Sequence, residues 1–343
     1  MALSSPSAEA RLRTERIAIL ALFVGAVTIA FAPILVRLSE VGPSATGFHR
    51  FLLAIPLYWA MAATLPRATV AEGSERPTSV RDFVLISMAG VYLAADVAVW
   101  HYSIQMTTVA NSTLLANVAP VFVVLAGWIL FGTRVTGTYM IGLAAAMTGV
   151  FILSRASLSL SEEHFIGDLL GVLTAVFYAA YQISVERLRK RFSTVTIMKY
   201  AIPASALIML PVALASGDDL LPVTLAGWGF LIALAVGPQV FGQGLIAWAL
   251  AHLPVAFASV SLLVQPVTAA IVAWALFGEQ IGAQQAVGGV IVLAGIMLAR
   301  VVEIKNAFPF PERLTTNRYI EANPELKVVE SSENGARLLI LAD

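Results

Sequence analysis

The chain has 343 residues, of which 59% are hydrophobic and 12% are charged, and its mean hydropathy is +0.84. A water-soluble domain carries about 25% charged residues, so this composition excludes a mostly water-facing surface and predicts a membrane protein. The formal net charge of zero gives no sign of a nucleic-acid partner, and the absence of cysteine excludes disulfides and thiolate metal sites.

Ten apolar stretches are long enough to cross a bilayer, which needs about 20 residues of helix. They are continuously apolar, whereas the strands of a membrane barrel are shorter and alternate in polarity. The sequence therefore predicts an all-α polytopic protein with ten transmembrane helices. In chain order we expect them at Ile17–Val36, Ser44–Leu65, Phe83–Ser103, Ala110–Phe131, Thr136–Leu153, Gly167–Val185, Thr194–Ala215, Thr224–Ala251, Ala256–Phe277 and Ile281–Val302.

The first stretch follows three arginines and could be read as a secretory signal peptide. It is long for one, and Pro33 and Arg37 stand near its end without a small-residue cleavage site. We interpret it as an uncleaved first helix.

Basic residues predict which ends of the helices face the cytoplasm. Of the 21 Lys and Arg residues, all but Arg37, Arg50 and Arg155 fall in segments on the same side as the N-terminus. Because basic loops stay in the cytoplasm, we expect a multi-pass protein of the inner (plasma) membrane with both termini cytoplasmic. Outside the helices this leaves a short N-terminal segment, an external loop and a polar tail that we expect to be flexible: residues 1–16, 155–166 and 303–343.

The chain repeats itself. At a shift of 146 residues, Pro120 falls on Pro266 and Trp128 falls on Trp274, and several glycines keep the same register. The repeats are expected at residues 17–154 and 167–302. Each contains five helices, an odd number, so the second copy enters the membrane in the opposite orientation. Such inverted repeats are typical of secondary transporters, whose substrate site lies near the midplane between the halves.

The two copies resemble the EamA unit of the drug/metabolite transporter superfamily. The stretches LLANVAPVFVVLAGWILFGTRV and SLLVQPVTAAIVAWALFGEQIG share its apolar helix with a central proline, followed by a glycine-containing turn. Gly278-Glu279 matches the Gly-Glu turn, whereas the first copy has Gly132-Thr133-Arg134 instead. The resemblance covers Ile17 to Val302. It implies a ten-helix bundle that exports small metabolites, amino acids or drugs.

Ionisable residues inside the membrane are expensive and usually functional. Tyr92, Asp96 and Trp100 are spaced by four and share one face of the third helix. We expect this face to line a substrate pocket, where Asp96 binds an ammonium group or carries a proton; the alternative is a structural Asp bonded to a neighbouring helix. Arg50 either binds a carboxylate or extends to the headgroups.

Two further faces complete the expected substrate site. Tyr178, Tyr181 and Gln182 share a face of the sixth helix, for which helix packing is the alternative. Gln239 and Gln243 share a face of the eighth helix, in a segment whose glycines and proline predict a bent or locally opened helix.

Prolines and glycines within the helices are candidate hinges. Pro120 and Pro266 each remove one backbone hydrogen bond, and Gly237-Pro238 interrupts the eighth helix. The alternative is a fixed kink that serves only packing.

The sequence offers little for catalysis. The four histidines have no metal-ligand spacing, and neither a nucleophile–base set nor a P-loop is present. We expect a transporter, not an enzyme, with no cofactor and no metal site. Its partners are then a small-molecule substrate and the lipid bilayer, without nucleic acid. Amphipathic-cation efflux and a non-transporting receptor or scaffold stay open, as do proton coupling and the oligomeric state.

Overall fold

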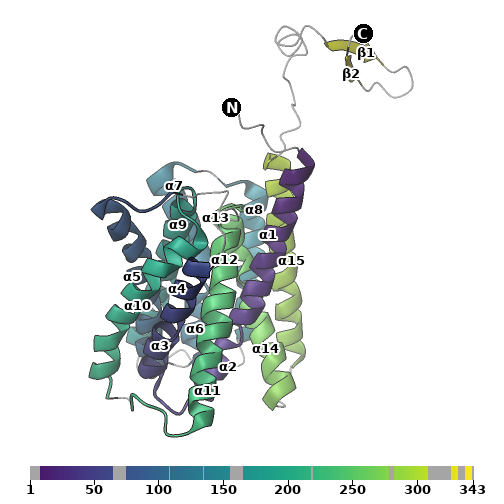
Figure 1. Ribbon diagram of the computed structural model, residues 1–343. Coiled ribbons are helices and arrows are strands. Elements are labelled where there is room, and N and C mark those ends of the chain that lie inside the picture. The colour runs from purple at the N-terminus through teal and green to yellow at the C-terminus, as the bar shows by residue number, and fades with distance from the viewer. Residues whose placement is uncertain are drawn as a thin grey trace. The chain divides into compact units, whose positions relative to one another are not determined.

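The computed structural model describes residues 8–64, 75–107, 109–133, 135–154, 165–217, 219–277, 282–307, 326–330 and 337–341. Within these residues the first 300 fold as a bundle of helices (Figure 1). Seven of its helical segments are long and apolar enough to cross a membrane, and residues 137–152 and 283–299 form two shorter apolar helices. The prediction of an all-α polytopic membrane protein is confirmed.

The helices occupy the ten predicted stretches. Five of those stretches are single helices: α5 (Val80–Met106), α8 (Gly137–Ser154), α9 (Phe165–Arg189), α10 (Thr194–Ala215) and α15 (Ala283–Ala307). The other five are interrupted, and comprise α1 (Ala8–Ile29) with α2 (Ala32–Arg37), α3 (Pro43–Leu52) with α4 (Ala54–Thr64), α6 (Val109–Ala116) with α7 (Ala119–Phe131), α11 (Leu225–Leu234) with η4 (Ala235–Gly242) and α12 (Gln243–Ala249), and α13 (Val255–Ser261) with α14 (Val264–Phe277).

Prolines account for most of the interruptions. Pro33 and Pro120 each stand in the first turn of the helix that follows a break, where a missing N–H costs nothing. Pro266 lies in the first turn of α14 and has the same effect. The eighth stretch stays helical throughout, but it changes from α-helix to π-helix at residues 235–242, around Pro238, and back to α-helix after them. The predicted irregularity of that segment is therefore a widened turn of helix.

The two halves of the chain interleave. Helix α9, from the second half, packs against α5, α6 and α7 of the first half. Helix α1, from the first half, packs against η4, α12 and α14 of the second half. Helix α10 contacts α3, α4 and α5, so it joins the second half to the second and third stretches of the first. Figure 1 shows α5 and α10 on one side of the bundle and α1 and α15 on the other.

Glycines bring helices of the two halves into backbone contact. Gly142 and Gly149 of α8 face Gly295 and Gly288 of α15, and a side chain at Gly142 or Gly149 would collide with the opposite backbone. The seven-residue spacing of these glycines predicts close packing, and the structure places that packing within one chain.

At one end of the bundle, Glu40 joins the two halves. It lies between α2 and α3 and accepts hydrogen bonds from the backbone N–H groups of Val223 and Thr224 and from the Thr224 hydroxyl, at the start of α11. The Thr224 hydroxyl, together with the backbone donors, holds the pKa of the Glu40 carboxyl below its ordinary value. A side chain at Gly227 would collide with this carboxylate. We call this end the Glu40 end.

At the opposite end, Arg191 makes the corresponding connection. Its guanidinium bonds to Glu75 at 2.8 Å and to Asp82, in the first turn of α5, at 2.9 Å. These bonds, the one to Glu75 foremost, raise the pKa of Arg191 above its ordinary value. Asp82 also completes a capping box with Ser79, which fixes where α5 begins. We call this end the Arg191 end.

Residues 301–343 form a separate unit. Two short strands pair antiparallel there, β1 (Leu326–Glu330) with β2 (Arg337–Leu341), and Leu326 lies opposite Leu341. The apolar last segment of the tail thus has a strand partner within the tail, a feature that the sequence does not predict. Most of the expected external loop 155–166 lies outside the described residues, as do Gly278 and Glu279.

Candidate functional site

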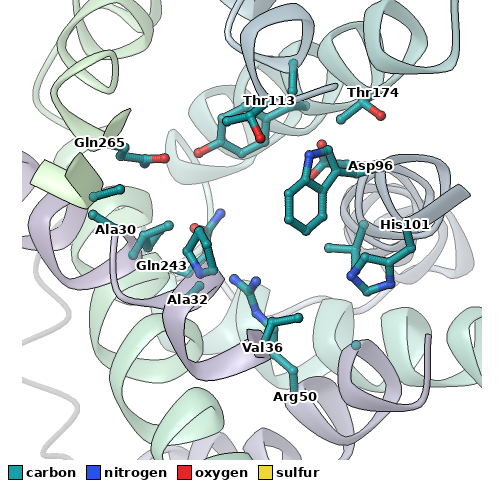
Figure 2. Close-up of a pocket in the computed structure, with 18 of the residues that line it drawn as sticks. Ala30, Ala32, Val36, Arg50, Asp96, His101, Thr113, Thr174, Gln243 and Gln265 are labelled. Atoms are coloured by element: carbon teal, nitrogen blue, oxygen red, sulfur yellow. The ribbon is translucent and has the colours of Figure 1, made fainter. Parts of the chain in front are cut away.

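A cavity of about 200 Å³ lies inside the bundle, in the half nearer the Glu40 end. Helices of both halves of the chain line it, so it is bounded by α1, α2, α3, α5, α6, α9, α12 and α14, with Leu234 at the end of α11. Figure 2 shows the polar side chains that converge on it from different helices. The polar and ionisable residues of its wall are Arg50, Asp96, Trp100, His101, Thr113, Asn117, Thr174, Tyr178, Gln243 and Gln265.

Arg50 provides the positive charge of the cavity. It stands in the last turn of α3, and its guanidinium points into the space between Gln243 and Asp96 (Figure 2). Its Nε donates a hydrogen bond of 2.7 Å to Oε1 of Gln239, which uses one of the five guanidinium N–H groups. Because Arg50 faces the cavity, its predicted alternative of extending to the headgroups does not fit this structure.

Asp96 provides the negative charge. It lies on the cavity wall close enough to Arg50 to interact electrostatically. The two make no ion pair within 4 Å, and among the described residues Asp96 has no hydrogen-bond partner. The structural alternative for Asp96, a bond to a neighbouring helix, is therefore not what this conformation contains. An opposed pair of charges held apart leaves room for a ligand between them.

The π-helical segment supports Arg50. Tyr58 of α4 is fully buried, and its hydroxyl lies within hydrogen-bond distance of the carbonyl oxygens of Gln239 (3.0 Å) and Val240 (3.2 Å). A π-helix changes the usual pairing of backbone carbonyls, and the single proton of the Tyr58 hydroxyl can be donated to either of these two. Gln239, which accepts from Arg50, is thereby fixed at its backbone.

Aromatic and amide side chains supply the rest of the wall. The Tyr178 ring stacks on Tyr181 with centroids 6.2 Å apart, and the Tyr178 hydroxyl lies close to Gln265. Trp100 contacts His101 at 5.5 Å between ring centroids. Gln243 and Gln265 each retain a buried amide nitrogen without a partner among the described residues. Such donors suit the oxygen atoms of a bound solute.

The structure brings five of the nine predicted substrate-site residues to the cavity wall: Arg50, Asp96, Trp100, Tyr178 and Gln243. The other four do not line it. Gln239 touches the site only through Arg50, Tyr92 packs against the apolar core, and Tyr181 and Gln182 are fully buried one turn beyond Tyr178 toward the Arg191 end.

Sequence reasoning missed part of the wall. His101 is not among the residues predicted above, but it is buried and faces the cavity beside Trp100. Thr113 and Asn117, spaced by four on the fourth stretch, are polar residues on one helix face and offered a signal that could have been used. Thr174, four residues before Tyr178, offered the same signal.

The candidate hinges lie at helix interruptions around the cavity. Pro266 is part of its wall, Pro120 lies in the first turn of α7, and Gly237 and Pro238 belong to the π-helix. Among the described residues, no group of three His, Cys, Asp or Glu side chains is arranged to hold a metal ion.

Known proteins of similar sequence are transporters by name. The pseudopaline exporter CntI of Pseudomonas aeruginosa is 27% identical over 256 residues, which cover 70% of this chain and 88% of that protein. A probable terminal-alkyne amino-acid exporter of Streptantibioticus cattleyicolor is 27% identical over 266 residues, covering 74% and 88%. An uncharacterized transporter of Archaeoglobus fulgidus is 28% identical over 218 residues, covering 64% and 76%.

The fold is also found among solved structures. One crystal structure superimposes with a TM-score of 0.69 over 83% of this chain and 98% of its own, at 18% sequence identity. The sequence pattern of the EamA-like transporter family matches this chain twice, over residues 16–155 and again over residues 165–301. These two matches cover both predicted repeats and most of the bundle, and the chain belongs to the EamA-like transporter family.

Proposed function

We propose that this protein is a secondary transporter that exports small organic solutes, with amino acids or related metabolites as its substrates. The observation that carries the proposal is the cavity in which Arg50 and Asp96 face the same space without pairing. A solute with a carboxylate and an ammonium group satisfies both charges, and the carboxylate accepts from the guanidinium.

The pair of charges favours amino acids over amphipathic cations. Asp96, with Trp100 and Tyr178 nearby, would suit a cation. Arg50 would repel it, because the two charged groups share a cavity of only about 200 Å³. A zwitterion has no such conflict. The names of two relatives, a pseudopaline exporter and a probable amino-acid exporter, are consistent with solutes of this kind.

Alternating access is the mechanism that the repeats support. Two family matches of nearly equal length, each predicted to hold five helices, imply antiparallel copies that can open to either side. The Arg191 end then faces the cytoplasm of a plasma membrane, because the basic segments gather there. The substrate gradient, alone or with protons, drives the cycle.

The test is flux in proteoliposomes that contain the full chain. The panel consists of radiolabelled α-amino acids with side chains of increasing size and, separately, amphipathic amines. We expect saturable, protein-dependent flux of at least some amino acids and none of the amines. Empty liposomes and the Asp96→Asn variant are the controls.

Two outcomes would contradict the proposal. Flux of the amines alone would assign the protein to cation efflux. An absence of protein-dependent flux for every solute, from protein that elutes as a single species in detergent, would favour a receptor or scaffold.

A further inference from the structure

Between the cavity and the Arg191 end lies a set of polar side chains that are buried but unsatisfied. Tyr181 and Gln182 come from α9, Gln243 from α12 and Ser259 from α13, and each is 1% exposed. The Tyr181 hydroxyl, both amide atoms of Gln182, the amide nitrogen of Gln243 and the Ser259 hydroxyl have no hydrogen-bond partner among the described residues. Tyr181 lies close to Gln243, although no contact between the two meets the distance and angle of a hydrogen bond. We call these four side chains the polar layer.

The polar layer lies in the part of the bundle toward the Arg191 end and adjoins the cavity. At a rise of 1.5 Å per residue, its members stand about 6 to 12 Å from the helix ends at the Arg191 end. Helix α9 contacts both α12 and α13. Gln182 follows Tyr178 by one turn on the same face of α9, and Gln243 is itself part of the cavity wall. The layer therefore extends the cavity toward the Arg191 end.

Buried polar groups without partners are rare in folded proteins because each destabilises the arrangement that buries it. Several such groups in one part of the bundle need an explanation. A carrier supplies one, because the same groups meet water and solute when the other conformation opens. Resting on the function proposed above, we propose that the polar layer lines the second half of the solute's path, which is closed in this conformation and leads from the cavity to the Arg191 end.

Two serines on α13 form a matched pair for the test. Ser259 and Ser261 are both 1% exposed, but the Ser261 hydroxyl donates to the carbonyl of Phe257 at 2.9 Å, whereas Ser259 has no partner. The native chain has no cysteine, so Ser259→Cys and Ser261→Cys each introduce a single thiol without a background. The experiment uses the full chain in vesicles and a charged, membrane-impermeant thiosulfonate applied to either side.

The expected result is modification of Ser259→Cys from the Arg191 end, at least about 10 times faster than that of Ser261→Cys. Because a minor conformation is populated at about 0.1–10%, the reaction should be about 10 to 1000 times slower than that of a fully exposed thiol. Equal rates for the two thiols, or modification of Ser259→Cys only from the Glu40 end, would overturn the proposal.

A second variant tests the role of the unsatisfied groups. Gln182→Met keeps the length of the side chain and removes both orphaned atoms, so it should favour the closed arrangement and slow the labelling of Ser259→Cys by about tenfold. Gln105→Met, at an exposed position near the Glu40 end of α5, should leave the rate unchanged. An unchanged or faster rate in Gln182→Met protein that elutes as a single species would contradict the proposal.

Labelling does not depend on the identity of the solute, so the two proposals can fail separately. If labelling occurs as expected but no amino acid is transported, the proposed substrate class is rejected and the proposed path is retained. Amino-acid flux with equally protected thiols would keep the function and reject the path.

Discussion

The two opposed charges of the cavity decide which solutes it can hold. Asp96 has no partner among the described residues, and Arg50 uses only one donor on Gln239. Each therefore offers a strong hydrogen bond to a group of opposite charge, and such bonds contribute about 1.5–3 kcal/mol. The contribution of each charge can be measured separately by removing the matching charge from the solute.

Asp96→Asn should raise the KM for a transported α-amino acid by about 10- to 100-fold, the equivalent of one charge-assisted hydrogen bond. It should change the KM of the N-acetylated derivative little, because that solute has no ammonium group for Asp96 to bind. The measurement is concentration-dependent flux of both solutes through wild type and variant. A loss of equal size for both would make the role of Asp96 structural.

The sequence predicts the charged groups of the site better than it predicts the full set of residues that line the cavity. Asp96, Arg50 and Trp100 were found because ionisable groups are costly in a bilayer and must face the interior. The position of His101 could not be predicted, because its direction depends on how α5 crosses α3, where Gly47 lets its ring approach closely. How these two helices cross is a matter of tertiary packing, which the sequence of one helix does not determine.

At the scale of elements, all ten stretches were predictable because length and apolarity fix a membrane helix. The positions at which these helices are interrupted were less predictable. Pro120 and Pro266 were recognised as sites of irregularity, and helices do end beside them. The break between α3 and α4 at Leu53 was not predicted, although Pro56 stands in the first turn of α4 as Pro266 does in α14. The sequence predicts an irregular segment here, but not its π-helical type or its hydrogen bond from Tyr58, which is 181 residues away from Gln239.

Gly90 tests the packing of α5 on α10. A Cβ atom at Gly90 would overlap the backbone carbonyl of Ala201, and backbone cannot move aside as a flexible side chain can. Gly90→Ala should therefore destabilise the protein by about 1–3 kcal/mol or more, seen as a lower melting temperature in detergent.

The matched control is Gly229→Ala. Gly229 lies in helix α11 with open space around its Cα, so an added methyl group meets nothing and helix propensity should gain about 0.5–1 kcal/mol. If both variants melted at the wild-type temperature, the close contact of α5 with α10 would be incorrect.

Glu40 gives the connection at its end of the bundle a dependence on pH. Since its folded-state pKa is lowered, chiefly by Thr224, the carboxylate stabilises the fold at pH values above the ordinary pKa of a glutamate. This contribution is lost as the pH falls from there through the lower folded-state pKa.

Glu40→Gln should therefore melt below wild type at neutral pH, and the difference should vanish as the pH falls into the acid range. Thermal melts of the two purified proteins across pH give the comparison. A difference that stays constant at every pH would mean that the charge of Glu40 does not contribute.

At the scale of the whole molecule, the two sequence repeats do not form two separate bundles, because helices of one half pack among helices of the other. Helix α9 lies among helices of the first half, and α1 lies among helices of the second. The sequence predicted a site between the two halves, and the cavity wall does combine residues of both. The interleaving itself could not be predicted, because it depends on which apolar faces meet and such faces carry little pattern in a membrane.

The central claim is that one cavity binds a zwitterionic solute and is exposed to each side of the membrane in turn. Counterflow tests it most directly: proteoliposomes are preloaded with an unlabelled amino acid and diluted into a trace of the labelled one. The account predicts that the label inside the liposomes rises transiently above its equilibrium level. The reason is that each carrier that has released an unlabelled molecule outside returns with a labelled one. Simple equilibration that is unaffected by preloading would contradict it.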